Sequence, residues 1–241
     1  MSFSYEFLLV LGVAGFYLYD SAMLLCFNEL VLVESRGKWS FACPDSRWKI
    51  RRKHPYLPNP LAPHRHLFRQ AWSVEQPRPA PGTDRSVSQF VSALRPFGIW
   101  AGALFAEMLI VLPLVIFLLG TGTAFFITLL IIYLTIVVAL VLVYLRRKTL
   151  GLAGKGFSSL AFDALACPPF AINLVRKISL GSGLRLDPVE FARRHLEHQQ
   201  FESLVKALLG RVDEELEVED EDSPRGKKLR DFRNRLREHG A

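Results

Sequence analysis

Three apolar runs constrain this chain more than any other feature of its sequence. They cover residues 7–27, 97–119 and 124–145, with 21, 23 and 22 residues, close to the roughly 20 that cross about 30 Å of hydrocarbon as a helix. The third run contains no charged residue, and only Gly120–Thr123 separates it from the second. These two runs are expected to form an antiparallel hairpin. The sequence therefore predicts an α-helical membrane protein with three transmembrane helices.

Lysines and arginines are distributed unevenly around these runs. The segment 34–96 holds twelve of them against four acids, 120–123 holds none, and Arg146, Arg147 and Lys148 follow the third run. Because cytoplasmic connections carry the excess of basic residues, we expect the N-terminus outside and the C-terminus in the cytosol. Only one charge, Glu6, precedes the first run, which does not resemble a cleaved signal peptide. The abundance of Arg over Lys favours a bacterial plasma membrane.

The remaining segments are assigned from composition and periodicity. Apolar stretches at 30–33 and 39–42 flank a turn at 35–38 and predict two short strands, residues 47–52 suggest a third strand, and four prolines between 55 and 63 exclude regular structure there. The predicted order is a first transmembrane helix (1–29), a small cytosolic β and proline-loop element (30–72), a linker (73–96), the transmembrane hairpin (97–145), an interfacial segment (146–180), a cytosolic amphipathic helix (181–216) and a charged tail (217–241).

Two acidic residues lie inside the apolar runs, Asp20 and Glu107. A charge at the centre of a membrane helix costs roughly 2.5–3.5 kcal/mol on insertion scales, so each acid calls for a partner, a proton or a watery cavity. Counting depth along antiparallel helices places both acids near the midplane, level with Tyr133 and Thr135 of the third run. We expect these four to form an intramembrane polar cluster. It is either a proton or cation site, or a neutral carboxyl hydrogen-bonded across the bundle or paired with another subunit.

Small residues recur at every fourth position of the second run, at Gly98, Gly102 and Ala106. This spacing favours close packing of transmembrane helices. Pro113, six residues after Glu107, is expected to kink the same helix and to free a carbonyl.

The first cytosolic loop interleaves basic and aromatic residues. Beside a bilayer this composition favours contact with anionic headgroups or with a protein partner, and nucleic acid is not expected because no nucleic-acid-binding signature accompanies it. The predicted surface consists of Arg47, Trp48, Lys49, Arg51, Arg52, Lys53, Arg65, Arg69 and Trp72.

No metal or cofactor is expected. His64 and His66 have alternate spacing, but no acid or cysteine completes a site at a recognisable distance along the sequence, and the three cysteines show neither a zinc nor a disulfide spacing.

Residues after 156 combine apolar and charged patterns. Segment 157–180 is apolar, but Asp163, Asn173 and a Pro-Pro pair favour an interfacial or re-entrant hairpin of two short helices over a fourth span. Asp187-Pro188-Val189-Glu190 predicts a helix start, and the apolar stripe that follows must be covered. The acidic block 213–222 and the basic block 225–237 are typical of interaction tails. Leu229, Phe232 and Leu236 suggest a short helix that docks on the membrane, on the acidic block or on a partner.

The chain shows no nucleophile elbow, P-loop, dinucleotide fingerprint or HExxH motif. The favoured function is a non-enzymatic integral membrane accessory or scaffolding subunit, binding protein partners and anionic lipid through its cytosolic loop and tail. A homo-oligomer is one form that this association with other membrane or cytosolic proteins can take. One alternative is an ion- or proton-translocating subunit that uses Asp20 and Glu107. The other is a small membrane enzyme acting on lipid, with His64 and His66 near the headgroups.

Overall fold

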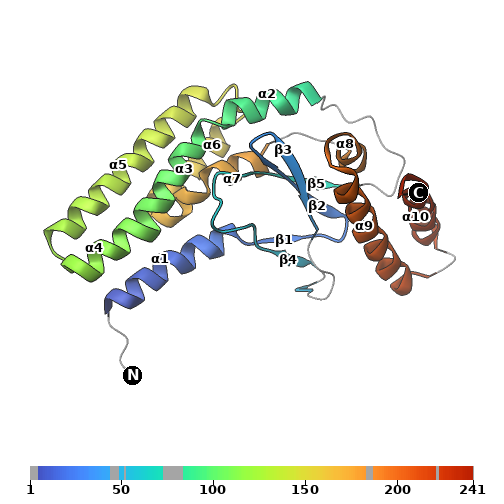
Figure 1. Cartoon of the computed structure of the whole chain (residues 1–241), viewed down its shortest axis with the longest axis horizontal. Helices are drawn as coiled ribbons and strands as arrows, with labels where there is room; N and C mark the ends of the chain where they lie inside the picture. Colours follow the sequence, from blue (N-terminus) through green and yellow to red (C-terminus); the bar gives the residue numbers. More distant parts are fainter. Residues whose placement is uncertain are drawn as a thin grey trace. The chain divides into compact units, whose positions relative to one another are not determined.

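The chain divides into two compact units in a computed structural model that describes residues 5–43, 49–51, 53–72, 84–182, 187–220 and 223–240. Unit 1 comprises Met1–Met23, Leu57–His66 and Asp84–Gly183. Unit 2 comprises Leu24–Tyr56, Leu67–Thr83 and Leu184–Ala241. Figure 1 shows the elements of both. The predicted loop element 30–72 is therefore divided, because its proline-rich part, 57–66, belongs to the helical unit.

Unit 1 is built from helices. Phe97–Leu119 is one continuous 23-residue helix that includes a π-helical turn, and Thr123–Arg146 is a second helix of 24 residues. The tight turn between them contains Gly120 at φ +73°, a conformation that glycine adopts without steric cost. The elements are α1 (Tyr5–Ser21), α2 (Asp84–Leu94), α3 (Phe97–Ala106), η1 (Glu107–Val111), α4 (Leu112–Leu119), α5 (Thr123–Arg146), α6 (Gly154–Ala166), η2 (Pro168–Asn173) and α7 (Leu174–Leu180).

The α3–α4 and α5 helices are long and apolar enough to cross a membrane. Their apolar side chains are largely uncovered: Ile99, Leu118, Leu130 and Leu145 are each 69–77% exposed. A core helix of a water-soluble protein would bury these side chains, since burying one large aliphatic side chain contributes about 1.5–3 kcal/mol. Both helices therefore present apolar side chains that the rest of the chain does not cover. The predicted hairpin is present, with its second helix beginning one residue earlier and ending one residue later than expected.

The first apolar run does not form the predicted 21-residue helix. Helix α1 ends at Ser21, and β1 (Met23–Leu25) follows and pairs with β4 (His54–Tyr56). Its 17 residues extend about 25 Å at 1.5 Å per residue, less than the hydrocarbon thickness, so a third transmembrane span is not confirmed. The apolar composition placed the end of this helix too far along the chain. Leu25 of β1 is buried, 0% exposed, and residues of a buried strand are as apolar as those of a membrane helix.

The segment predicted as a linker, 73–96, contains helix α2. Val87, Val91 and Leu94 are buried together with Phe90 on one side of it. This spacing of three and four residues is the apolar stripe of an amphipathic helix. The serines that suggested a linker occupy the other positions. Residues 73–83 lie outside the described part of the chain.

Unit 2 contains a three-stranded sheet of order β3-β2-β5, formed by β2 (Glu29–Ser35), β3 (Lys38–Ala42) and β5 (His66–Ala71). Strands β2 and β3 pair antiparallel from Val31↔Ala42 to Ser35↔Lys38. Arg36 and Gly37 form the turn with φ of +53° and +85°, and two successive positive φ angles define the hairpin turn that matches strand twist. The predicted hairpin is thus present, and the third strand of this sheet is β5.

The expected third strand, 47–52, lies partly outside the described residues, and Ile50 makes only an isolated bridge with Lys53. Strand β5 could not be recognised from its sequence. His66 and Gln70 are polar but buried, whereas the usual alternation in a sheet places apolar residues inside and polar residues outside.

Helices α8 (Pro188–His195) and α9 (His198–Val218) also belong to unit 2. Asp187 caps α8 as its sequence suggests, and its Oδ1 accepts hydrogen bonds from the amides of Val189 and Glu190 at 3.0 and 3.1 Å. Phe191 packs edge-on against Trp39 of β3, with ring centroids 4.8 Å apart. The α9 stripe is buried at Phe201, Leu204, Val205, Leu208 and Val212.

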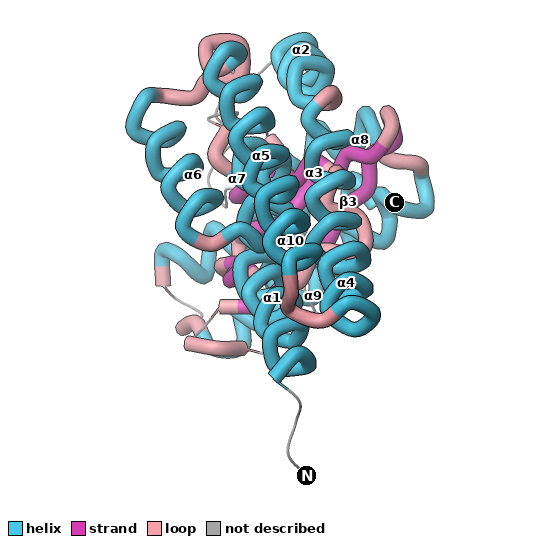
Figure 2. Tube along the Cα trace, turned by 90° about the vertical axis from the view of Figure 1, so that its left-hand side faces the viewer, coloured by secondary structure: helices cyan, strands magenta, loops and turns pink. Residues whose placement is uncertain are grey.

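The charged tail contains an ordered helix, α10 (Pro224–Gly240), which packs on α9. Figure 2 shows both as helical segments. Leu229, Phe232 and Leu236 are buried, and Phe232 stacks on Trp72 at 4.8 Å with an interplanar angle of 3°. Ion pairs join the basic helix to the acidic block: Arg225 with Glu215 and Glu219 at 3.1 and 3.2 Å, and Arg233 with Asp213 at 3.3 Å. The sequence suggested that this helix docks on the membrane, on the acidic block or on a partner. In the structure it contacts the acidic block.

We expect the change Phe232→Ala to loosen α10. Truncating a buried phenylalanine costs about 3–5 kcal/mol, and the helix would lose its stacking contact with Trp72. Hydrogen–deuterium exchange of the full chain should show faster exchange across 224–240. The exposed Lys227 on the same helix, changed to Ala, is the matched control. Equal protection in the two variants would contradict the packing described.

Candidate functional site

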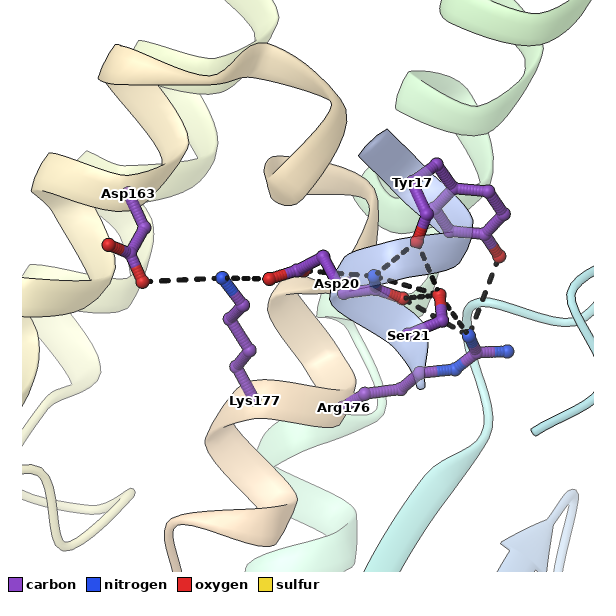
Figure 3. Close-up of polar contacts among 7 residues, drawn as sticks. Tyr17, Asp20, Ser21, Asp163, Arg176 and Lys177 are labelled. Atoms are coloured by element: carbon purple, nitrogen blue, oxygen red, sulfur yellow. Dashed lines mark hydrogen bonds and ion pairs between the residues drawn. The ribbon is translucent and has the colours of Figure 1, made fainter. Parts of the chain in front are cut away.

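A buried arginine organises the polar interior of unit 1. Arg176, on α7, is 2% exposed, and its guanidinium fork donates to neutral oxygens on both sides. Figure 3 shows the side that faces Tyr17 and Ser21. Nη2 donates to the carbonyls of Asn59 and Ala62 at 2.6 and 2.9 Å. Nη1 donates to Asn173 Oδ1, Ser21 Oγ and Tyr17 OH at 3.1, 3.3 and 3.5 Å. One side chain thus joins α7, η2, the end of α1 and the proline loop.

Asn173 extends this network from the end of η2. Its Nδ2 donates to Asp20 Oδ2 and Ser21 Oγ, each at 3.0 Å. Tyr17 donates its hydroxyl hydrogen to the Pro60 carbonyl at 2.5 Å. The last turn of α1 is therefore held by η2 on one side and by the loop 57–66 on the other.

An ion-pair chain borders the network. Lys177 Nζ lies 2.9 Å from Asp20 Oδ1 and 3.3 Å from Asp163 Oδ2, and it also lies over the Phe170 ring, 4.8 Å from the centroid. Figure 3 shows Lys177 between the two carboxylates. Lys177 thus places one positive charge between two carboxylates. This pairing offsets part of the cost of holding Asp20 and Lys177 away from water, since an unpaired buried charge would cost several kcal/mol.

The network includes residues that the sequence did not connect. From the sequence, Asp163 and Asn173 only disfavour a fourth span, and Arg176 and Lys177 are only charges that such a span would place outside. The two short helices expected between 157 and 180 are present as α6 and α7. The η2 turn between them contacts α1, α3 and α5. A basic pair within an apolar segment, together with an acid within another apolar run, was the available signal.

The predicted cluster of Asp20, Glu107, Tyr133 and Thr135 is divided in the structure. Asp20 bonds Lys177 and Asn173, whereas Glu107 Oε1 lies 3.0 Å from Thr135 Oγ1. Tyr133 is 39% exposed on the surface of α5. The structure thus brings together only Glu107 and Thr135.

The hydroxyl of Thr135 is shared between two oxygens. Besides Glu107 Oε1, the Ile131 carbonyl lies 3.0 Å from it. One hydroxyl hydrogen cannot serve two acceptors fully, so the Glu107 carboxyl oxygen and the Ile131 carbonyl compete for it. The second carboxyl oxygen, Oε2, is buried and has no hydrogen-bond partner among the described residues.

Glu107 also begins the π-helical turn Glu107–Val111, in which the Leu112 amide donates to the Glu107 carbonyl. The proline at 113 explains this irregularity, because it has no N–H and its ring clashes with the carbonyl four residues earlier. A π-helical turn contains one residue more than an α-helical turn, and this extra residue moves the proline ring away from that carbonyl. The kink expected at Pro113 therefore takes the form of a π-bulge, a feature that is common at functional sites.

The small-residue stripe does not mediate close packing of two helices. A β-carbon added at Gly98 would lie 3.3 Å from His64 Cβ of the proline loop, and one added at Gly102 would meet nothing within 4 Å. Ala106 is half-buried. Only Gly98 is required by a close neighbour, and that neighbour is a loop.

The predicted basic and aromatic surface is not one continuous surface. Trp72 is core, 1% exposed, Arg69 pairs with Glu29 at 2.5 Å, and Lys49 pairs with Glu214 at 2.9 Å. Arg65 is half-buried, whereas Arg51 and Lys53 are exposed. Arg47, Trp48 and Arg52 lie outside the described residues. Composition could not distinguish these environments because unit 2 supplies acids and aromatic rings from distant parts of the chain.

The pairing at Glu29 affects its ionisation. Burial alone would raise the pKa of its carboxyl, but hydrogen bonds from Arg69 and from the Cys26 amide outweigh burial and hold the pKa below its ordinary value of 4.5. Glu29 therefore stays ionised and keeps Arg69 neutralised.

A second buried arginine, Arg211 of α9, was also missed. It is 3% exposed and donates to the carbonyls of Phe27 and Glu29 at 3.1 and 2.7 Å, at the start of β2. Burial raises the pKa of the nearby Cys43 thiol, and the Arg211 charge opposes that rise. Cys43 is one of three free cysteines.

The two histidines of the proline loop have different surroundings. His66 is buried, whereas His64 is half-buried and its Cβ lies near Gly98 of α3. Among the residues that the structure describes, no group of three or more His, Cys, Asp or Glu side chains is placed to hold a metal ion.

Comparisons of the chain with protein-family models, with curated proteins and with solved structures found no match.

We expect Arg176→Met to destabilise unit 1 by about 3–5 kcal/mol, because it leaves buried acceptors unpaired and removes a charge that balances the carboxylates. Arg176→Lys should cost less, since it keeps the charge but lacks the planar fork needed to reach both sides. Thermal unfolding of the full chain in mild detergent measures both. Arg147→Met removes an arginine at the end of α5 and is the control; if Arg176→Met unfolds at the same temperature, the network is not structural.

A double-mutant cycle tests the contact between Glu107 and Thr135. The changes Glu107→Leu and Thr135→Val should be coupled by about 0.6–1.7 kcal/mol, the range measured for hydrogen bonds between membrane helices. Glu107→Gln should be nearly neutral, because its amide can donate to the same hydroxyl. Unfolding in detergent provides the four free energies. Additive single effects would show that the two side chains do not interact.

Proposed function

We propose that this chain is an integral membrane accessory or scaffolding subunit, in which unit 1 is the membrane anchor and unit 2 binds a protein partner. The observation that carries the proposal is the internal pairing of the polar groups of unit 1. Asp20 pairs with Lys177 and accepts a hydrogen bond from Asn173, and Arg176 donates to Asn173 and to the loop carbonyls of Asn59 and Ala62. Polar groups that bond one another within unit 1 stabilise its fold, which suits a membrane anchor. The uncovered apolar sides of α3–α4 and α5 support a membrane location.

The proposed orientation has the N-terminus outside and the C-terminus in the cytosol of a plasma membrane. Arg95 precedes α3, and Arg146, Arg147 and Lys148 end α5, so basic residues flank one end of the antiparallel hairpin. The turn at the other end is uncharged. This asymmetry supports a cytosolic location for the basic end. Helix α1 completes the anchor, as a third membrane-inserted helix whose last turn lies in the Arg176 network.

Translocation of protons or ions is the second candidate. The observation that favours it is Glu107, which has one buried carboxyl oxygen with no partner among the described residues and lies at a π-bulge. Asp20 no longer supports this candidate, because Lys177 neutralises it. A lipid-modifying enzyme has less support, since His66, one of the two histidines expected near the headgroups, is buried.

Site-specific photo-crosslinking in the native membrane tests the accessory function. Photoreactive residues at the exposed Lys38, Lys53 and Lys206 of unit 2 are expected to give discrete adducts with one protein partner, whereas the same residue at Gly122, in the turn between the spans, should not. Alkaline carbonate should fail to release the chain from membranes. Release by carbonate, or no adduct at any unit 2 position, would overturn the proposal. Proton flux in proteoliposomes that is lost in Glu107→Gln would favour the second candidate.

A further inference from the structure

Basic residues that the internal networks do not use gather at one end of the helical hairpin. Between Asp84 and Asp163 the only acid is Glu107, inside the second apolar run. The basic residues that directly flank the two long helices are Arg95, Arg146, Arg147, Lys148 and Lys155, which we name the basic collar.

The antiparallel arrangement places the collar at a single end of unit 1. Arg95 precedes the first residue of α3, and Arg146–Lys148 closes α5, while Lys155 lies in the first turn of α6. Figure 1 shows the start of α3 and the end of α5 on the side away from the α4–α5 turn. Because the two helices have nearly equal lengths of 23 and 24 residues, their basic ends lie at similar depth relative to a membrane.

Among the residues that the structure describes, many basic ones are paired with an acid, whereas those of the collar are not. Lys49, Arg69, Lys177 and Arg225 all form ion pairs. Within the described part of the chain no ion pair involves any collar residue. Arg95, Arg146, Lys148 and Lys155 are exposed, and Arg147 lies over the Tyr144 ring at 4.3 Å. Four cations at one end of the spans are therefore available to an external anion.

Aromatic and apolar groups accompany the collar. Tyr144 contacts Phe157 of α6, with ring centroids 5.3 Å apart, and α6 exposes Phe162 and Leu165. Tyrosine and tryptophan gather where hydrocarbon meets headgroups, and a helix with apolar residues on one side lies readily in that layer. The depth at which the collar lies is therefore the depth of phosphate groups.

We propose that the basic collar binds the headgroups of anionic phospholipids, an inference that rests on the proposed membrane location of unit 1. The collar and the anionic headgroups carry opposite charges and lie at the same depth. Each lysine or arginine next to an anionic leaflet strengthens the interaction roughly fivefold. The collar also replaces the lipid surface expected in the first loop, where Lys49, Arg69 and Trp72 are engaged inside unit 2.

The test uses the full chain in nanodiscs containing equal amounts of phosphatidylglycerol and phosphatidylcholine. The lipids that remain bound after transfer to mild detergent are quantified by mass spectrometry. The collar variant changes Arg95, Arg146, Lys148 and Lys155 to Gln. The matched control changes four exposed residues of unit 2, Lys38, Lys206, Lys227 and Arg237, to Gln. We expect the wild type and the control to retain phosphatidylglycerol with a preference at least tenfold above that of the collar variant.

Salt provides a second measurement that needs no variant. Raising the ionic strength from about 0.1 to 1 M shortens the screening length from about 10 to 3 Å, so the wild-type preference should fall severalfold. A preference that persists in the collar variant or at high salt, or a wild type without preference, overturns the lipid inference. Those outcomes leave the accessory function standing if the unit 2 adducts form. Release by carbonate would instead remove the membrane premise.

Discussion

Burying a guanidinium among apolar helices is the constraint on which unit 1 depends. Arg176 cannot lose its charge, so its place in the interior requires oxygen acceptors on both sides. The proline loop supplies carbonyls from Asn59 and Ala62, and α1 and η2 supply side-chain oxygens. Segments that share no continuous secondary structure must therefore come together around one residue. Arg211 has the same role at the start of β2 in unit 2.

This arrangement explains how a chain with charges in its apolar segments remains compatible with a membrane. Asp20 lies in an apolar run, and Lys177 and Asp163 lie in an apolar segment, yet the structure joins all three. The long apolar helices α3–α4 and α5 contain one carboxyl group, that of Glu107, and it bonds Thr135. Polar groups thus turn inward or remain at the helix ends, which leaves the long surfaces apolar.

Much of the local structure could be predicted from sequence because its causes are local. The uncharged run 124–145, the glycine turn of the β2–β3 hairpin and the Asp187 cap each depend on residues only a few positions apart. The end of α1 at Ser21 could not be predicted in the same way. The next residues are equally apolar, but Leu25 is used by a sheet whose other strand lies at His54–Tyr56.

The sequence by itself determined the two long apolar helices, their tight connection and the basic residues at one end. Each follows from side-chain hydrophobicity and spacing along a continuous segment. Only the tertiary structure decided which polar groups meet: Asp20 pairs with Lys177 rather than approaching Glu107, and Trp72 stacks on Phe232 instead of lying at a membrane surface. The physical reason is that these partners are 157 and 160 residues apart along the chain, so no local pattern selects one oppositely charged or aromatic partner over another.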